Sequence, residues 1–230
     1  MRIKYLSHSA FLIEGSKSLL FDPYLTGNPK AVATPYDLKP DFILVSHGHG
    51  DHFGDALDIA RYNDATIIAP NELALYCTRR GVDAHPMHIG GKHRFGESLT
   101  VKLTPALHGS AIIEEGLSQY LGMPCGFLVE LDGKTIYFAG DTALTYDMKA
   151  VIGDLHHVDV ALLPIGDNYT MGPEDAAVAA RWVDPDIVIP MHYNTFPLIE
   201  QDPEAFRKQV EEETPGRKVF VLKPGEILEL

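Results

Sequence analysis

Residues 41–52 read Asp-Phe-Ile-Leu-Val-Ser-His-Gly-His-Gly-Asp-His, and most of the chemistry of this chain can be predicted from them. Phe42 to Val45 form a continuous apolar run, which is typical of a strand buried on both faces. Because residues two apart in an extended chain point the same way, His47 and His49 can grip one ion together, while Asp51 and His52 can reach a second. Imidazole and carboxylate groups are ligands for Zn²⁺, Mn²⁺ or Fe. The stretch therefore predicts a metal site at the end of a buried strand.

Further ligand-type residues follow other predicted strands. His108 comes after the strand 99–103, Asp141 follows Gly140 at the end of the strand 135–139, and His192 ends the strand 187–189. The alternative, a histidine-rich surface loop that collects metal adventitiously, does not explain why such residues recur at strand ends. Seven side chains exceed the four that one tetrahedral ion takes, so we expect two divalent ions, with zinc first and Mn or Fe as alternatives.

The composition excludes several classes of protein. The chain has 230 residues, 45% hydrophobic and 22% charged, which is typical of a globular fold, and we expect one domain over residues 1–230. Its net charge of −13 argues against a nucleic-acid partner, because binding to phosphates needs a basic surface. No apolar run is long enough to span a membrane. Two cysteines make no disulfide framework and favour a cytoplasmic location.

The remaining pattern mixes short strands with helices. We expect the segment 24–40 to be loop, a hairpin at Asp132-Gly133, and a helix opened by Asn71 as its N-cap. The other expected elements are strands at 3–6, 10–14, 19–21, 41–46, 66–69, 99–103, 126–130, 135–139, 158–163, 187–189, 218–222 and 227–230, and helices at 54–62, 173–183 and 203–213.

Taken together, these motifs resemble the metallo-β-lactamase-fold hydrolases. The resemblance is closest to a branch of metal-dependent hydrolases related to the ascorbate-phosphate lactonase, and it covers essentially the whole chain. The motifs that carry it are His47-Gly48-His49-Gly50-Asp51-His52, His108, Gly140-Asp141-Thr142 and His192, together with His8-Ser9-Ala10-Phe11, Asp22-Pro23, Thr170-Met171-Gly172-Pro173-Glu174 and Met191 to Pro197.

The resemblance implies an α/β fold, a four-layered αββα sandwich of two mixed β-sheets with the site on one edge. It implies one ion on His47, His49 and His108. It places a second ion on Asp51, His52 and His192, with Asp141 as the bridge. The remaining site residues that we single out are Asp22, as the partner of a ligand histidine's second N–H, and His8 and Asn194, as substrate-binding groups. A structural histidine at position 8 and a backbone-capping Asn194 are open alternatives.

Other residues are assigned more ordinary roles. We expect His85, His88, His93, His156 and His157 to be solvent-exposed. Cys77 should pack in the core, and packing is also favoured for Cys125 over a place in the cleft. The segment from Gly109 to Pro124 lacks clear periodicity and follows a ligand histidine, so it is a candidate substrate-selecting lid, with a plain surface loop as the alternative.

The sequence thus predicts a metal-dependent hydrolase of a small-molecule ester, lactone or phosphodiester, including phosphorylated substrates, in which two divalent ions hold a hydroxide. Asp51 is the expected catalytic group, orienting or deprotonating that nucleophile. Two alternatives stay open: a nuclease or other phosphodiesterase of the same superfamily, and a non-catalytic metal-binding or ligand-binding protein that retains the fold. The oligomeric state is open.

Overall fold

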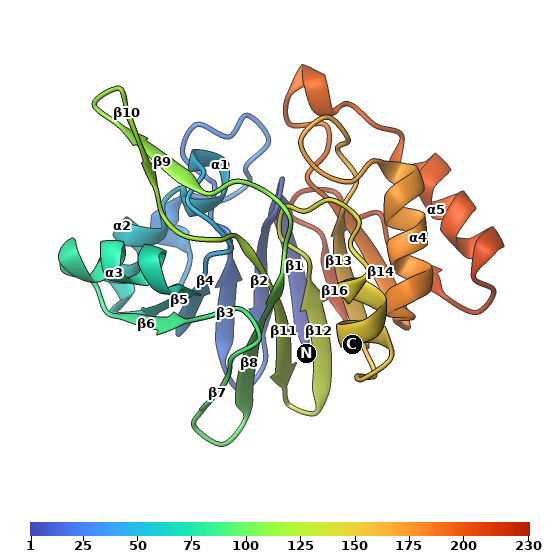
Figure 1. The fold of residues 1–230 in the computed structure, drawn as a ribbon, viewed down its shortest axis with the longest axis horizontal. Helices are drawn as coiled ribbons and strands as arrows, with labels where there is room; N and C mark the ends of the chain where they lie inside the picture. The colour runs from blue at the N-terminus through green and yellow to red at the C-terminus, as the bar shows by residue number, and fades with distance from the viewer.

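The computed structural model describes residues 1–230, and two seven-stranded mixed sheets form its centre (Figure 1). The first sheet has the order β16-β1-β2-β3-β4-β5-β6. Its strands are β1 (Arg2–Ser7), β2 (Ala10–Glu14), β3 (Ser18–Phe21), β4 (Phe42–Leu44), β5 (Thr66–Pro70), β6 (Ala84–Met87) and β16 (Ile227–Glu229). The last strand of the chain therefore lies beside the first.

The second sheet has the order β15-β14-β13-β12-β11-β8-β7. Its strands are β7 (Lys92–Phe95), β8 (Leu99–Pro105), β11 (Cys125–Leu131), β12 (Lys134–Phe138), β13 (Val160–Pro164), β14 (Ile187–Met191) and β15 (Lys218–Val219). Between β8 and β11 the chain forms a separate two-stranded hairpin, β9 (Ala111–Glu114) and β10 (Leu117–Tyr120), which projects from the body in Figure 1.

Helices cover the outer face of each sheet. The first sheet carries α1 (Gly50–Phe53), α2 (Ala56–Asn63) and α3 (Asn71–Arg79); the second carries α4 (Pro173–Val183), α5 (Pro203–Glu213) and the π-helical turn η2 (Met148–Gly153). One apolar core lies between the sheets and two more lie under the helices. This arrangement confirms the predicted αββα sandwich. The chain has no helix with the length and apolar character needed to cross a bilayer.

Local sequence explains the elements that were predicted correctly. Helix α4 has Pro173 in its first turn with two acidic residues after it, and α5 begins where the carboxylate of Asp202 accepts hydrogen bonds from two backbone N–H groups. The β11–β12 hairpin turns at Asp132-Gly133, both with positive φ (51° and 77°), as a tight hairpin turn requires.

Other expectations were wrong. Pro70 is the N-cap of α3, and Asn71 is already helical. The expected helix 54–62 corresponds to α2 but begins two residues later, at Ala56, and the short α1 before it was not predicted. Gly54 ends α1 with a φ of 40°, and a Cβ there would lie 2.4 Å from the carbonyl oxygen of Pro23. Strands β6 and β7 were missed. Both are four-residue edge strands without a strand-like pattern, since β6 contains Pro86 and β7 is mostly charged or polar, and only pairing with a neighbour makes them strands.

The strand directions place the predicted site residues together. The parallel neighbours β4 and β5 of one sheet, and β12, β13 and β14 of the other, end at the same edge of the sandwich, next to α1 (Figure 1). At this edge the backbone N–H of His192 donates to the carbonyl oxygen of His8 over 2.9 Å, which joins the two sheets. The segments that follow these strands carry the candidate ligands.

Candidate metal centre

The first group of ligand-type side chains is His47, His49 and His108. The Nε2 atom of His47 lies 3.0 Å from Nδ1 of His49, which in turn lies 3.3 Å from Nε2 of His108. Their facing nitrogens all lie within 4.8 Å of one another, so one ion could contact all three. The side chains of His47 and His49 thus point to the same place, as their spacing predicted.

The second group comes from the helical turn that follows. His49 is the N-cap of α1, and its carbonyl oxygen accepts hydrogen bonds from the N–H groups of His52 and Phe53. This turn directs Asp51 and His52 toward His192, which follows β14, while the ring of His52 also lies 4.2 Å from that of His47. The ligand atoms of Asp51, His52 and His192 lie within 4.8 Å of one another, and His8 belongs to the same cluster.

Asp141 lies between the two groups. Its Oδ2 atom is 3.2 Å from Nε2 of His52, 3.1 Å from Nε2 of His192 and 3.5 Å from Nε2 of His108. The preceding Gly140 has a φ of 64°, and a Cβ there would lie 2.6 Å from the carbonyl oxygen of Cys125. Only glycine allows this close approach, which brings the carboxylate to the position that a bridging ligand needs.

Asp22 supports the centre from behind. Its buried carboxylate lies 2.7 Å from Nδ1 of His52 and accepts hydrogen bonds from the backbone N–H and hydroxyl of Ser46, over 2.8 and 2.6 Å. The hydroxyl of Ser46 also lies 2.9 Å from Nδ1 of His47. Asp22 thus lies where the predicted partner of a ligand histidine should lie, with the Nε2 atom of His52 left facing the centre.

The buried side chains of the centre shift one another's pKa values. Burial lowers the pKa of His47, and burial together with the charge of His192 lowers the pKa of His8 to about 4. For His52 burial acts in the same direction, but the carboxylates of Asp141 and Asp22 outweigh it and raise the pKa well above its ordinary value. Burial would raise the pKa of Asp141, yet the imidazoles of His192 and His52 hold it well below the usual range. The centre therefore favours positive charge between its carboxylates.

Unpartnered polar atoms show that these residues fit divalent ions. The buried atoms without a hydrogen-bond partner include Nε2 of His8, Nε2 of His52, Oδ1 of Asp141 and both ring nitrogens of His192. Buried polar atoms are almost always paired, so such a concentration calls for a further binding partner. Imidazole nitrogens and carboxylate oxygens that face one another at 3.1–3.5 Å suit a metal cation placed between them, which would take the place of ring protons.

A cavity of about 480 Å³ opens directly onto the centre. Its polar wall is formed by His49, Asp51, His108, Asp141 and His192, and its other wall by Tyr169, Phe196, Pro197 and Leu198. No lysine or arginine lines it. A small molecule in this cavity would contact the candidate ligands on one side and a largely apolar surface on the other.

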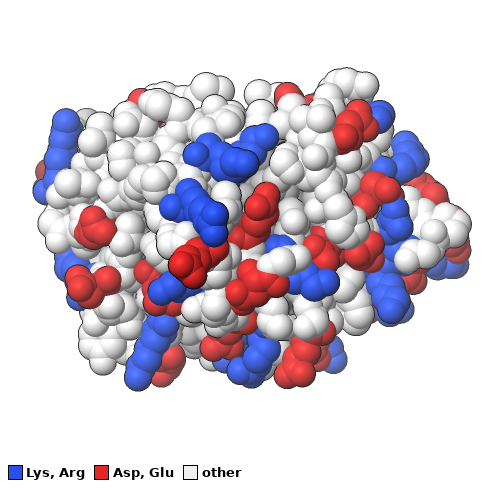
Figure 2. All heavy atoms as spheres, turned by 90° about the horizontal axis from the view of Figure 1, so that it is seen from below, with Lys and Arg blue, Asp and Glu red and all other residues white.

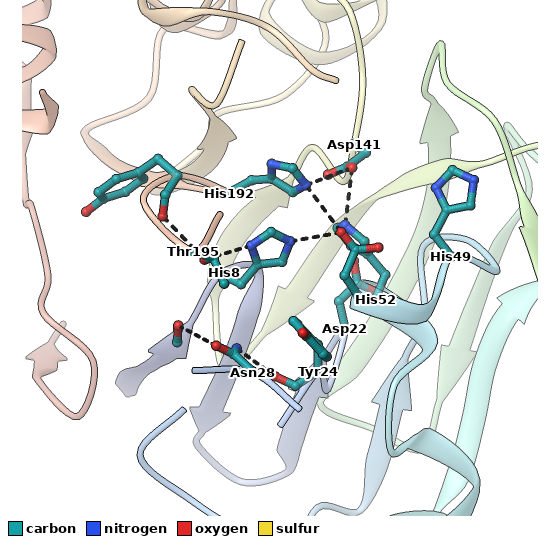
Figure 3. A network of polar contacts seen from close by, with 12 residues as sticks. His8, Asp22, Tyr24, Asn28, His49, His52, Asp141, His192 and Thr195 are labelled. Carbon is teal, nitrogen blue, oxygen red and sulfur yellow. Dashed lines mark hydrogen bonds and ion pairs between the residues drawn. The ribbon is translucent and has the colours of Figure 1, made fainter. Parts of the chain in front are cut away.

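The two predicted substrate-binding residues do not line this cavity. His8 is fully buried and lies 3.3 Å from Asp51, behind the ligands (Figure 3). Asn194 points away: its side-chain amide donates to the carbonyl oxygen of Gln201 and accepts from the N–H of that residue. The structure therefore favours the backbone-capping alternative for Asn194 and a role within the centre for His8.

Three further expectations need correction or refinement. The segment 109–124 is an ordered hairpin, not an irregular loop, and none of its residues lines the cavity. Cys77 and Cys125 are both buried, as packing requires, and Cys125 stays out of the cleft. His85 and His156 are half-buried, whereas the other three ordinary histidines are exposed as expected.

Sequence reasoning missed the apolar wall and two supporting hydroxyls. Phe196 and Pro197 lie within the noted motif 191–197, and Tyr169 and Leu198 lie next to noted motifs, but an apolar side chain in a loop gives no signal of its own. Ser46 and Thr195 lie one and three residues from His47 and His192. Their contacts with Asp22 and His8 join residues far apart in the chain, so only the folded structure brings them to notice.

Comparisons with known proteins show the family of the chain. Residues 17–193 match the beta-lactamase superfamily domain. A UPF0173 metal-dependent hydrolase of Desulforamulus reducens is 57% identical over 234 residues, and YtkL of Bacillus subtilis, with the same family name, is 52% identical over 233 residues; each match covers 100% of both chains. The structure of Igni18, a metallo hydrolase from Ignicoccus hospitalis, is 38% identical with a TM-score of 0.89 and covers 100% of this chain and 98% of its own.

These matches extend over the whole chain and agree in naming metal-dependent hydrolases. They do not bear on the relation to the ascorbate-phosphate lactonase, which stays a prediction. The chain is more than 50% identical to two UPF0173 metal-dependent hydrolases over their full length, and its αββα sandwich carries candidate metal ligands at one edge. The chain therefore belongs to the beta-lactamase superfamily and, within it, to the UPF0173 metal-dependent hydrolases.

Proposed function

We propose that this metal-dependent hydrolase uses two divalent ions to cleave the ester or lactone bond of a small, uncharged molecule. The observation that carries the proposal is the meeting of two ligand groups at a cavity whose opposite wall is apolar and free of lysine and arginine. His47, His49 and His108 would hold one ion. The second would lie on Asp51, His52 and His192, with Asp141 between the two.

When bound, two such ions lower the pKa of a shared water from 15.7 to about 7 and polarise the substrate oxygen. The residues of the chain then orient the reactants. Asp51 is the ligand-type carboxylate with the greater exposure to the cavity, so it is placed to accept a hydrogen bond from the attacking water. Tyr169 and Leu198 would hold the apolar part of the substrate against the opposite wall.

The charge of the cavity favours a neutral substrate over a phosphorylated one. A phosphate group is usually bound by arginine or lysine, and neither residue lines the cavity. The chain as a whole carries a net charge of −13, which repels anions during approach. An ester or a lactone with an apolar substituent meets neither obstacle.

A nuclease of the same superfamily is the alternative that the surface disfavours. Binding to a nucleic-acid backbone needs a continuous basic surface. A net charge of −13 and a cavity that no lysine or arginine lines do not supply it. On the face opposite α1, Lys and Arg are likewise interspersed with Asp and Glu (Figure 2). RNA binding that weakens steeply with salt would support the nuclease alternative; no binding at low salt would exclude it.

A panel of three bond types tests the proposal. The metal-loaded protein is assayed against p-nitrophenyl butyrate, a γ-lactone and bis-p-nitrophenyl phosphate, before and after chelation and after Zn²⁺ or Mn²⁺ is restored. We expect metal-dependent turnover, with kcat/KM at least 10-fold higher for the ester or the lactone than for the phosphodiester. The reverse order would refute the substrate class. No turnover of any compound by protein that holds two ions would favour the non-catalytic alternative.

A further inference from the structure

His8 is a buried residue of the centre that the two-ion proposal leaves without a role. His8 comes directly after β1, its backbone has a φ of 58°, and its side chain is 0% exposed. Its ring lies between Thr195 and the cluster that contains His52, Asp141 and His192 (Figure 3). A backbone held in the left-handed region is costly for a residue other than glycine, so the position of this imidazole calls for an explanation.

The Nε2 atom of His8 has the same surroundings as those of the proposed ligands. It lies 3.3 Å from a carboxylate oxygen of Asp51, just as Nε2 of His52 and Nε2 of His192 lie 3.2 and 3.1 Å from Asp141. None of the three makes a hydrogen bond with adequate geometry at this distance. Each of these nitrogens is therefore close to a carboxylate oxygen without being hydrogen-bonded to it.

The other ring nitrogen is held by Thr195. Nδ1 of His8 lies 3.0 Å from the hydroxyl oxygen of Thr195, and that hydroxyl can donate to the carbonyl oxygen of Tyr193 at 3.4 Å. With its proton directed there, the hydroxyl accepts from Nδ1–H of His8. This tautomer leaves a lone pair on Nε2 that faces the carboxylate of Asp51. Metal-binding histidines show the same arrangement, in which the second nitrogen donates to a fixed oxygen.

A histidine that only orients Asp51 would look different. It would present Nε2–H along the line to the carboxylate oxygen and would make a well-directed hydrogen bond. A lone pair facing a carboxylate is repulsive, and a cation between the two groups removes that repulsion. The ligand atoms of His8, Asp51, His52 and His192 lie within 4.8 Å of one another, so one ion can contact all four.

We infer that Nε2 of His8 is a ligand of the second ion, alongside Asp51, His52 and His192. The inference rests on the proposed two-ion centre and deepens it. With Asp141, this position then has five protein ligands, more than the four of a tetrahedral zinc site. An ion of higher coordination number, such as Mn²⁺, therefore fits the second position better than it fits the position formed by His47, His49 and His108.

A structure of the metal-loaded wild-type protein tests the inference directly. Crystals are grown with Mn²⁺ or Zn²⁺, and the ions are located by anomalous scattering. We expect Nε2 of His8 within about 2.0–2.3 Å of the second ion, the range of a metal–imidazole bond. A separation above about 3 Å, with both ions present, would overturn the inference while leaving the two-ion hydrolase intact.

Variants give an independent readout in solution. His8→Leu removes the donor at similar volume, Thr195→Val removes the acceptor that holds Nδ1, and His88→Leu is a matched exposed control. Each is titrated with Zn²⁺ and with Mn²⁺ against a chromophoric chelator, and its fold is checked by circular dichroism. We expect at least 10-fold weaker binding of one ion in His8→Leu, a loss on the order of 10-fold in Thr195→Val, and no change in His88→Leu.

The outcomes separate this inference from the proposed function. Unchanged affinity for both ions in a folded His8→Leu variant would overturn the inference even if the wild type hydrolyses esters. A bond between His8 and the ion in a protein without hydrolytic turnover would support the inference and refute the proposed function. If His8→Leu does not fold, the metal-loaded wild-type structure alone decides.

Discussion

Asp141 is the residue on which both proposed ion positions depend. Its Oδ2 atom faces His52 and His192 of the second group and His108 of the first, at 3.1–3.5 Å. Its side chain is 3% exposed, so water contributes little to its solvation. A carboxylate in this position offsets the mutual repulsion of two cations, which no neutral side chain can do.

We expect Asp141→Asn to weaken the binding of at least one ion and to lower kcat by about 100-fold or more, as misplacement of catalytic groups does. The substitution keeps the volume and removes the charge. Metal content after dialysis and steady-state rates measure the two effects. Asp58→Asn, at an exposed position on α2, is the control and should change neither. Near-normal metal content and rate in Asp141→Asn would contradict the bridging role.

At the scale of elements, the β9–β10 hairpin is separate from the substrate cavity. Its tip residues Ile113 and Leu117 are 75% and 74% exposed. The hairpin is fastened to α3, where Tyr76 and Arg80 both contact the carboxylate of Glu114. Ser110, which precedes it, accepts a hydrogen bond from the N–H of Gly48. The base of the hairpin thus supports the metal-binding stretch, while its arm does not reach the cavity.

Replacing residues 113–118 with Asn-Gly should therefore leave both metal content and kcat/KM for a small ester within about 3-fold of wild type. Ile112 and Gln119 are direct partners across the hairpin, so a two-residue turn can join them. Elemental analysis and steady-state kinetics are the measurements. A marked rise in KM would restore the lid that the sequence suggested.

An edge strand of each sheet contributes one histidine to a pair of rings that pack together at a tilt. His85 on β6 and His93 on β7 have ring centroids 4.3 Å apart, and Phe95 packs against both. These strands are the edge strands of the two sheets. Burial, followed by the charge of His93, lowers the pKa of His85 from its ordinary value of 6.5. A positive charge on His85 at this separation is repelled by His93, so the contact disfavours protonation of His85.

This pair predicts a pH dependence of stability. The folded state binds His85's proton less readily than the unfolded state, so the free energy of unfolding falls as the pH drops below about 6.5 and is fully retained above it. His85→Phe keeps the packing and does not titrate. In denaturant unfolding of the metal-free protein, we expect it to lose less stability than wild type between pH 7 and pH 5. His88→Phe, at an exposed position, should follow wild type; equal slopes for His85→Phe and wild type would contradict the prediction.

For the whole molecule, the metal centre connects the two sheets. Asp51 and His52 follow β4 of the first sheet, whereas His108, Asp141 and His192 follow strands of the second. Ions bound here would hold the two halves of the sandwich together at one edge. Without them, several buried polar atoms have no partner. The stability of the fold should therefore depend on the ions.

Removing the metal should lower the melting temperature. An ion at 100 times its Kd stabilises the folded state by about 2.7 kcal/mol, which corresponds to about 5–10 °C in a chain of this size. Differential scanning calorimetry with and without a chelator, and after metal is restored, measures the effect. Asp141→Asn should show a smaller shift. A melting temperature that does not respond to chelation would show that the centre adds nothing to folding.

The sequence by itself predicted much of the fold and of the centre. The apolar run 42–45 marks a buried strand, because strand periodicity is a local property of the chain, and His47 to His52 directly after it mark candidate ligands. The helices 173–183 and 203–213 follow from a proline and acidic groups at their starts. The Asp132-Gly133 hairpin was also predictable from local sequence, because its turn needs residues that tolerate positive φ.

Only the tertiary structure decided the rest. Edge strands such as β6 and β7 become strands through their neighbours, and the hairpin at 111–120 has no pattern of its own. The cavity wall at Tyr169 and Leu198 and the contact of His8 with Thr195 each bring together segments far apart in the chain. Such contacts depend on how two sheets pack, and packing is a property of the whole molecule that no local stretch of sequence contains.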